Sequence, residues 1–565
     1  MRRSLRAVVI VLLLVLPVAA AFVIPVDGSV MATNGMVVTT HPLAAQAGLE
    51  ILKSGGNAFD AAVATAATLA VVEPLMSGLG GVGGYALVYD ASTKEVHSLD
   101  FIGEAPGAAT LEAFTAGERL WDRAHPARDS FKAPVVPGNL AGWSALLDRF
   151  GTKTWPDVLS SAIGYAEDGY VVTPAVARGF ADGGFGGTVG RYPYGASIFF
   201  KDGKAPAAGQ LLVQRDLAQT LRTIAAEGPQ AYYGGELAQK IVSFFDENGG
   251  LVDIEDFASY EARWQAPLEI SYRGHRVVSQ PPGGSGMTVL QSLKILEHFD
   301  LASYEDNSPE VIHLVAEAMK LAFIDEDRFN SGKDYADIPL ERLLSDDYAE
   351  AQSQRIDRER AAFYPPVPSR SETAVSEHTT HFTVADADGN VVSMTQTLML
   401  PAGVVVPGTG VIFNNGMSYF SLDPNDVNHI EPGQRPRFVM SPSMVLRDGE
   451  PWLALGSAGG WTIPQTIVQA LVRAIDFDMD ADEAVKAPRF VLRYLENSIP
   501  YMDGTDLVLE KAISPATRDG LEARGHRLRQ PASRLGMLNA IKIYRKNRVY
   551  SGGADPRREG HVAAW

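Results

Sequence analysis

The chain has 565 residues, of which 46% are hydrophobic and 21% charged, a composition typical of a globular protein with a sizeable core. It contains no cysteine, which excludes disulfides, thiolate metal sites and a cysteine nucleophile. Its net charge of -18 at pH 7 argues against nucleic acid and anionic membranes as partners and favours a small molecule or peptide.

The first 21 residues are typical of a secretory signal peptide. Arg2, Arg3 and Arg6 precede an uncharged run over residues 7–21 that ends in small residues. This run is shorter than the about 20 residues needed to cross a bilayer, although an uncleaved membrane anchor is the alternative. Signal removal lowers Lys+Arg from 49 to 46 against 67 acidic residues, and the net charge from -18 to -21. We expect an exported protein, periplasmic or secreted, that is free of the membrane once the signal is removed.

Helical spacing of apolar residues occurs twice within residues 40–73, on either side of a Gly-Gly pair, and predicts two helices joined by a tight turn. The following stretch, "SGLGGVGGYALVYD", contains the pattern G-x-G-x-x-G over residues 78–83. That pattern binds dinucleotides when it follows a strand and opens a helix, whereas here it follows a helix and opens a strand. We interpret it as close backbone packing.

Further helices and strands follow in a layered order. Helices are predicted at 139–149, 216–227, 235–248, 287–299, 309–328, 463–475 and 515–524. Strands are predicted at 379–385, 391–398, 410–413, 442–447 and 452–456. Helices on both sides of a strand-rich centre indicate a layered α and β domain. Residues 361–378, rich in proline and small polar residues, are expected to form a mobile loop or an ordinary linker.

The strand patterns around "DADGN" predict a β-hairpin with its turn centred near Asp388. In that register the numbers of paired residues sum to 776, so Thr379 lies opposite Thr397, with Thr395 on the same face. The turn also resembles the start of a calcium loop, but no glutamate stands at the twelfth position. A plain turn is therefore the interpretation.

Thr379 stands where the loop ends and the strand begins. If the chain is cut before it, the freed α-amine, with an ordinary pKa near 8, can take the proton of the threonine hydroxyl, so no separate histidine is needed. Without cutting, Thr379 is an ordinary strand threonine. The spacing of His378 and His381 does not fit a zinc helix motif, and neither Ser285 nor Ser457 lies in a G-x-S-x-G elbow. We predict no metal and no other cofactor.

Several stretches match one enzyme family in order and spacing. They are "GMVVTTHPLAAQAGLEILKSGGNAFDAAVA", "VPGNLAGWSALLDRFGT", "GGLVDIEDFASYEARW", "YRGHRVVSQPPGGSGMTVLQSLKILEHFD", "TTHFTVADADGNVVSMTQT", "GVIFNNGMSYF", "RPRFVMSPSMVLRDG", "GSAGG" and "GGADPR". On these stretches the chain resembles the γ-glutamyltranspeptidase family of N-terminal nucleophile hydrolases. The resemblance implies a four-layer αββα sandwich and a precursor that cuts itself between His378 and Thr379. The large chain, 22–378, and the small chain, 379–565, would then form a heterodimer.

The resemblance also implies roles for individual residues. Thr379 would form an acyl-enzyme that water or an amine resolves, and Thr397 would hydrogen-bond to this nucleophile. The N–H groups of Gly459 and Gly460, in "GSAGG", would stabilise the oxyanion, the alternative being a plain glycine turn. Thr380 and His381 would hold the strand.

The residues that bind the γ-glutamyl group in the family are replaced here. The substitutions are Ile102 for an arginine, Met399 for an asparagine, Gly416 for a glutamine or glutamate, Tyr419 for an aspartate, and Phe438 and Val439 for two serines. Burying a zwitterion against such residues costs several kcal/mol, so we predict poor activity on glutathione. Arg437, where the family usually has an apolar residue, offers a new anchor for an acidic acyl group such as glutaryl, unless it is a solvent-facing arginine.

Three functions follow from these observations. The first is an exported, self-processing amidohydrolase or acyltransferase with a remodelled, more apolar acyl pocket. The second is a conventional γ-glutamyltransferase or glutathione hydrolase, which a comparison of γ-glutamyl with neutral acyl anilides would distinguish. The third is a catalytically inactive periplasmic binding protein on the same fold, which would remain uncut and still bind a ligand.

Overall fold

The computed structural model describes residues 29–114, 130–181, 186–330, 338–364, 378–399, 401–492, 506–544 and 548–565. The predicted signal peptide and most of the loop predicted at 361–378 lie outside these ranges. Within them, no helix is both long and apolar enough to cross a membrane.

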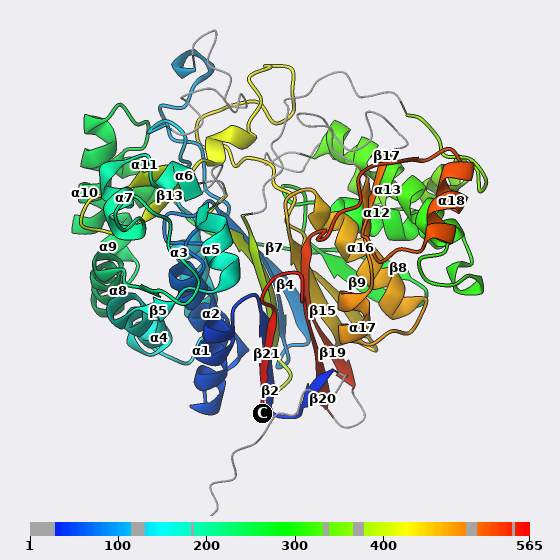
Figure 1. The fold of residues 1–565 in the computed structure, drawn as a ribbon, viewed down its shortest axis with the longest axis horizontal. Helices are drawn as coiled ribbons and strands as arrows, with labels where there is room; N and C mark the ends of the chain where they lie inside the picture. Colours follow the sequence, from blue (N-terminus) through cyan, green and yellow to red (C-terminus); the bar gives the residue numbers. More distant parts are fainter. Residues whose placement is uncertain are drawn as a thin grey trace, which may run out of the picture.

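Two seven-stranded sheets pack against each other in the centre of the molecule, with helices on both outer sides (Figure 1). The first sheet has the order β21 (His561–Ala564), β2 (Gly35–Thr39), β10 (Thr380–Asp386), β11 (Val391–Thr397), β3 (Gly83–Asp90), β4 (Glu95–Asp100), β7 (Arg263–Gln265). The second has the order β1 (Val30–Ala32), β20 (Val549–Ala554), β19 (Met537–Tyr544), β15 (Glu450–Ala458), β14 (Ser443–Arg447), β9 (His275–Ser279), β8 (Leu268–Tyr272). All neighbouring strands in these two sheets are antiparallel.

The helices form the two outer layers. Those beside the first sheet are α1 (Pro42–Lys53), α2 (Ala58–Val72), α3 (Asn139–Phe150), α4 (Trp155–Asp168), α5 (Pro174–Ala181), α6 (Gly186–Val189), α7 (Pro193–Phe199), α8 (Arg215–Glu227), α9 (Gln230–Tyr233), α10 (Glu236–Glu247) and α11 (Ile254–Ser259). Those beside the second are α12 (Gly286–Leu296), α13 (Pro309–Phe329), α14 (Leu340–Leu343), α15 (Asp346–Ser353), α16 (Thr462–Ile475), α17 (Ala481–Lys486) and α18 (Pro515–Ala523). The predicted four-layer αββα sandwich is confirmed.

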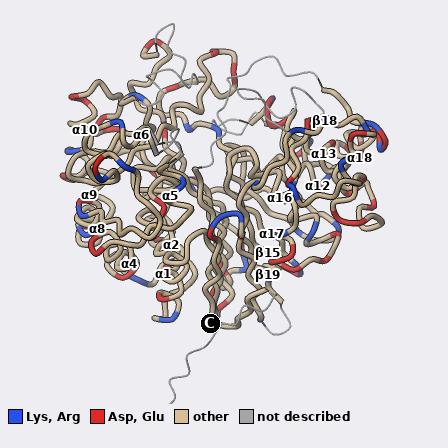
Figure 2. The backbone as a smooth tube through the Cα atoms, in the orientation of Figure 1, with Lys and Arg blue, Asp and Glu red and all other residues tan. Residues whose placement is uncertain are grey.

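Short strands complete the described elements: β5 (Tyr170–Val171) with β6 (Leu211–Leu212), β12 (Pro401–Val405) with β13 (Ile412–Asn414), and β16 (Phe490–Leu492), β17 (Asp506–Leu509) and β18 (Arg527–Leu528). Figure 2 shows that charged residues concentrate in the outer helices and loops, whereas the central strands carry few. Charge is thus kept in the parts of the chain nearest to solvent.

Alternating side chains divide the interior into three apolar cores. On β2, Val37 packs toward α1 and α2, whereas Met36 and Val38 pack between the two sheets. A third core fills the space between the second sheet and its helices. The two faces of the central strands are therefore both buried, which fixes the register of these strands.

The predicted hairpin forms as expected. Thr380 pairs with Gln396 and Phe382 with Met394, so paired numbers sum to 776. The glycine-rich stretch follows α2 and opens β3, and a Cβ at Gly83 would lie 1.8 Å from the Phe101 carbonyl oxygen. Its interpretation as close backbone packing is confirmed.

Candidate active site

Thr379 directly precedes β10, and its hydroxyl donates to Thr397 Oγ1 at 3.2 Å. The Thr397 hydroxyl in turn donates to the carbonyl of His378 and accepts the Met399 N–H at 2.8 Å. The two threonines are only 4% and 1% exposed. A buried chain of hydrogen bonds therefore joins the predicted nucleophile, its neighbour and the carbonyl of the peptide bond between residues 378 and 379.

Met399 closes this arrangement in an unusual conformation. Its φ angle is 62°, in the left-handed region that non-glycine residues seldom adopt. Such backbone strain persists only where surrounding contacts impose it, and it recurs at functional sites. Here the strained turn presents the Met399 N–H to Thr397.

His381 holds β10 between the two sheets. Its ring nitrogens lie 2.8 Å from Thr395 Oγ1 and 3.2 Å from Thr383 Oγ1. Burial lowers the pKa of His381 to about 3, so its ring is neutral at pH 7. The ring lies against Gly456, where a Cβ would come within 2.3 Å of it. The histidine is thus a buried spacer between sheets and holds the strand as the resemblance implied.

Gly459 and Gly460 follow β15, which runs toward the threonine pair. Ser393, near the middle of β11, donates to the Leu455 carbonyl at 2.9 Å. His381, which lies two pairs closer to Thr379 in the β10–β11 ladder, meets Gly456. The continuation of β15 therefore approaches the same end of the sandwich as Thr379. The two glycines have φ angles of 127° and 60°, which favour glycine.

Glu73 contacts Thr380, the residue after Thr379, and sequence analysis did not identify it as a candidate site residue. Its carboxylate accepts the hydroxyls of Thr40 at 2.7 Å and Thr380 at 3.1 Å. Burial raises the pKa of Glu73, while the nearby Arg558 guanidinium opposes this shift. Arg558 Nη1 also donates to the Thr379 carbonyl at 3.1 Å. Glu73 and Arg558 both lie outside the stretches that carry the family resemblance, which end at residue 64 before Glu73 and at residue 557 before Arg558, so sequence analysis had no signal for either.

Five of the predicted acyl-binding residues lie in the apolar core beside the second sheet. These residues, each no more than 3% exposed, are Ile102, Met399, Tyr419, Phe438 and Val439. The rings of Tyr419 and Phe438 stack with centroids 4.3 Å apart. Gly416 opens the short 3-10 helix Gly416–Tyr419 that carries the tyrosine. Residues from four separate segments thus belong to one apolar core, in which Tyr419 and Phe438 are in direct contact.

Arg437 is buried, so the interpretation as a solvent-facing arginine is wrong. Its Nη1 lies 3.9 Å from Asp327 Oδ1 and 3.4 Å from the carbonyls of Glu326 and Asn330. The guanidinium also lies 5.7 Å from the centre of the Trp461 ring. Burial raises the pKa of Asp327 well above its ordinary value, although Arg437 opposes the shift. The Arg437 guanidinium is therefore already bound by a carboxylate and two carbonyl groups of the protein itself.

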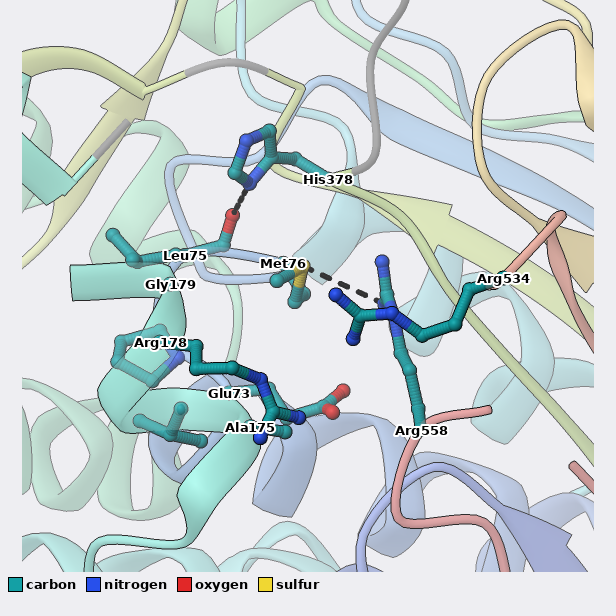
Figure 3. Close-up of a pocket in the computed structure, with 11 residues that line it drawn as sticks. Glu73, Leu75, Met76, Ala175, Arg178, Gly179, His378, Arg534 and Arg558 are labelled. Atoms are coloured by element: carbon teal, nitrogen blue, oxygen red, sulfur yellow. Dashed lines mark hydrogen bonds between the residues drawn. The ribbon is translucent and has the colours of Figure 1, made fainter. Parts of the chain in front are cut away.

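A pocket opens beside the peptide bond between residues 378 and 379 (Figure 3). Its polar and sulfur-bearing lining consists of Glu73, Met76, Arg178, His378, Arg534 and Arg558. His378 Nδ1 is hydrogen-bonded to the Leu75 carbonyl at 3.0 Å, which fixes the ring at the edge of the pocket. Sequence reasoning did not predict this pocket, because its residues come from five distant segments.

Comparisons with known proteins agree with this geometry. The γ-glutamyltranspeptidase family profile matches residues 44–565. The acylase ACY 1 proenzyme of Pseudomonas sp. (strain SE83) is 40% identical over 551 residues, covering 96% of this chain and 94% of the relative. The glutathione hydrolase proenzyme of Escherichia coli (strain K12) is 35% identical over 553 residues, covering 95% of this chain and 92% of the relative.

A solved structure agrees with the fold as well. The crystal structure of a cephalosporin acylase from Bacillus halodurans matches with a TM-score of 0.86 and 34% identity, covering 98% of this chain and 99% of that one. These matches extend over both sheets and both helical layers. The chain is therefore an enzyme that belongs to the γ-glutamyltranspeptidase family of N-terminal nucleophile hydrolases.

Proposed function

We propose that the chain is an exported proenzyme that cuts itself between His378 and Thr379 into chains 22–378 and 379–565. The product works as an N-terminal threonine amidohydrolase or acyltransferase with an apolar acyl pocket. The observation that carries this proposal is the hydrogen-bonded series from Thr379 Oγ1 through Thr397 Oγ1 to the His378 carbonyl. The proenzyme names of the relatives support it.

In the processing step, Thr379 Oγ1 attacks the carbonyl carbon of His378. A C–O bond forms, the C–N bond to Thr379 breaks, and the hydroxyl proton ends on the freed α-amine. Water then hydrolyses the resulting ester. Thr397 is placed to donate to the carbonyl oxygen as negative charge develops there, which lowers the barrier.

In the catalytic step, the α-amine of Thr379 takes the hydroxyl proton while Oγ1 attacks the substrate amide. The leaving amine receives that proton, and water or a second amine resolves the acyl-enzyme. The N–H groups of Gly459 and Gly460 stabilise the tetrahedral oxyanion, a role that is worth about 3 kcal/mol per donor in other acyl-transfer enzymes.

The acyl group is neutral and largely apolar in this proposal. Ile102, Tyr419 and Phe438 offer no charged partner to a γ-glutamyl zwitterion. Arg437 already lies against Asp327 and two carbonyls, so it holds the loop that carries Phe438 and is a poor anchor for an acidic acyl group. Among the described residues, the Asn415 amide and the Ser418 hydroxyl are buried without partners, which leaves them for a hydrogen-bonding substituent of the acyl chain.

A conventional glutathione hydrolase is the second candidate, and the identity to the Escherichia coli protein favours it. The buried, uncharged acyl-binding residues distinguish the two, because glutathione requires partners for both an α-amine and an α-carboxylate. An inactive binding protein is the third candidate and would keep the peptide bond between residues 378 and 379 intact.

The first test is the intact mass of the purified protein beside its Thr379→Ala and Thr379→Ser variants. We expect a fragment corresponding to residues 379–565 in the wild type and the serine variant, and none in the alanine variant. Hydrolysis of neutral acyl anilides and of γ-glutamyl anilide is then compared. A wild type that stays uncut and hydrolyses no anilide contradicts the proposal, and fast γ-glutamyl turnover supports the glutathione hydrolase.

A further inference from the structure

Arg558 lies in the loop between β20 and β21, and its guanidinium lies close to Met76 (Figure 3). Its Nη1 donates to the Thr379 carbonyl at 3.1 Å and lies 3.6 Å from Met76 Sδ. The Arg558 side chain is half-buried, and its guanidinium stays charged at every pH at which proteins work. A permanent positive charge is therefore bound to the backbone of the predicted nucleophile.

The residues on both sides of Arg558 hold this loop in place. Arg557 Nε donates to Glu510 Oε1 at 2.6 Å, and the Glu559 carboxylate accepts the Ala175 N–H at 2.8 Å. Both contacts join the loop to segments that are distant in the sequence. Arg558 therefore extends from a loop that is anchored on both sides, which restricts where its guanidinium can lie.

If the chain is cut before Thr379, that residue gains a free α-amine, which has to be neutral to take the hydroxyl proton. The amine nitrogen and the carbonyl oxygen of one residue are about 3 Å apart, so Arg558 Nη1 lies within about 7 Å of the amine. A like charge at such a distance disfavours the protonated amine. An α-amine has an ordinary pKa near 8 and is mostly protonated at pH 7 without such help.

Among the described residues, other titratable groups around this position come from α2, α5, β10 and the neighbouring loops. They are Glu73, Arg178, His378, His381, Arg534 and Glu559. Glu73 is hydrogen-bonded to Thr380, but burial raises its pKa and so weakens its negative charge. Cleavage adds a carboxylate to His378, and this charge favours the protonated amine. Arg558 contacts Thr379 directly and opposes both carboxylates.

We propose that Arg558 keeps the freed α-amine of Thr379 in its neutral, proton-accepting form and so sets the lower end of the pH range in which the enzyme works. Arg558 acts through Thr379, by its charge and by its hydrogen bond to the Thr379 carbonyl, and is thus a positioning residue. The inference rests on the proposed function, because the amine exists only after self-cleavage.

The test measures the pKa of the Thr379 amine in the cut protein. Only the neutral amine reacts with acetic anhydride, so the pH dependence of its acetylation, read by mass spectrometry on the peptide that begins at Thr379, gives this pKa. Arg558→Gln removes the charge but keeps an N–H donor, Arg558→Met removes both, and Arg558→Lys keeps the charge. We expect the two charge-free variants to raise the pKa of the amine by about one unit and the lysine variant to stay within about 0.5 units of the wild type.

Arg222→Gln is the matched control, because Arg222 lies on α8 in the outer helical layer, where it pairs with Glu167. It removes one arginine charge far along the fold from Thr379, and we expect it to keep the wild-type pKa of the amine. An equal shift in this variant would assign the effect to the net charge of the protein and overturn the role of Arg558.

A second readout is the pH profile of kcat/KM for any anilide that the wild type hydrolyses, because its acid limb reports the same group in the free enzyme. Arg558→Gln is expected to be about tenfold slower than the wild type near pH 6.5 and equal to it near pH 9.5, where the amine is neutral in both. A defect of the same size at both pH values points to a purely structural role and overturns the proposal.

Two other results decide between this inference and the proposed function. A cut protein whose amine has the same pKa in the wild type and in both charge-free variants contradicts the role of Arg558 alone. The same holds if Arg558→Gln folds but stays uncut, since the arginine then acts in self-cleavage. A wild type that stays uncut has no free amine and contradicts the proposed function and this role together.

Discussion

Replacing Thr397 with valine tests the hydroxyl that connects nucleophile and carbonyl. Valine keeps the size and β-branch of threonine but removes Oγ1, which accepts from Thr379 and Met399 and donates to His378. The side chain is 1% exposed, so water does not replace the lost group. We expect Thr397→Val to fold and to cut itself much more slowly than the wild type.

Loss of these contacts is expected to change both the rate of self-cleavage and the free energy of unfolding. Loss of one preorganised donor to a carbonyl under attack costs about 10²- to 10³-fold in rate. The Met399 N–H and the His378 carbonyl also lose a buried partner, at about 1 to 3 kcal/mol each if neither finds another. Together they would lower the free energy of unfolding by roughly 2 to 6 kcal/mol, at the low end if the turn relaxes.

The assay follows the appearance of the 379–565 fragment by mass spectrometry at fixed temperature, with urea unfolding of the uncut protein measured in parallel. Thr397→Ser is the control, because it restores the hydroxyl and is expected to cut within about tenfold of the wild-type rate. Cleavage of the valine variant at the wild-type rate would refute the role of Thr397. Slow cleavage in both variants with equal loss of stability would point to packing instead.

Three further predictions concern the surrounding residues. Gly459→Ala places a Cβ 2.5 Å from Thr462 Oγ1 at a φ of 127°, so we expect a loss of about 1 to 3 kcal/mol in urea unfolding and more than tenfold slower acylation in stopped-flow assays. Because burial raises the pKa of Glu73, folding favours its protonated form, and the wild type loses stability as the pH rises. Glutamine does not titrate, so the stability of Glu73→Gln relative to the wild type should rise between pH 4 and pH 7. A difference in stability that does not change with pH contradicts this prediction. The pKa of His381 is lowered to about 3, so the unfolded chain binds more protons between pH 3 and 6.5. Stability should rise with pH there by up to about 1.4 kcal/mol per unit, and His381→Gln should lose that slope.

Much of the fold near Thr379 could be predicted because its signals are local. The alternation on both sides of Asp388 and the Asp-Gly turn fixed the β10–β11 register, and apolar spacing located helices such as α13. The strands β2 and β19 were not predicted. Complete burial is not the reason, because β10 and β11 are buried at every residue as well. Neither β2 nor β19 is joined to a neighbouring strand by an Asp-Gly turn like the one that marks the β10–β11 hairpin.

The candidate site likewise contains contacts that the sequence predicted and contacts that it did not. Thr379 and Thr397 are 18 residues apart in one hairpin, so their contact followed from its register. Glu73 lies 307 residues from Thr380, and only the packing of α2 against β10 brings them together. Arg437 was recognised as unusual, but its burial depends on Asp327, which lies in α13. No local sequence pattern predicts contacts between residues that are so far apart in the chain.

The proposed catalytic residues and the proposed acyl-binding residues therefore lie in different kinds of structure. Thr379, Thr397 and His381 belong to a hairpin whose buried register leaves no freedom to shift. The proposed acyl-binding residues lie in the core beside the second sheet, whereas the pocket of Figure 3 is lined by loops and a helix beside the first. Loop residues can change without disturbing strand pairing, since they carry no ladder hydrogen bonds. If the proposed function holds, a chain of this family can therefore keep its acylation chemistry while the loops that bind the acyl group change.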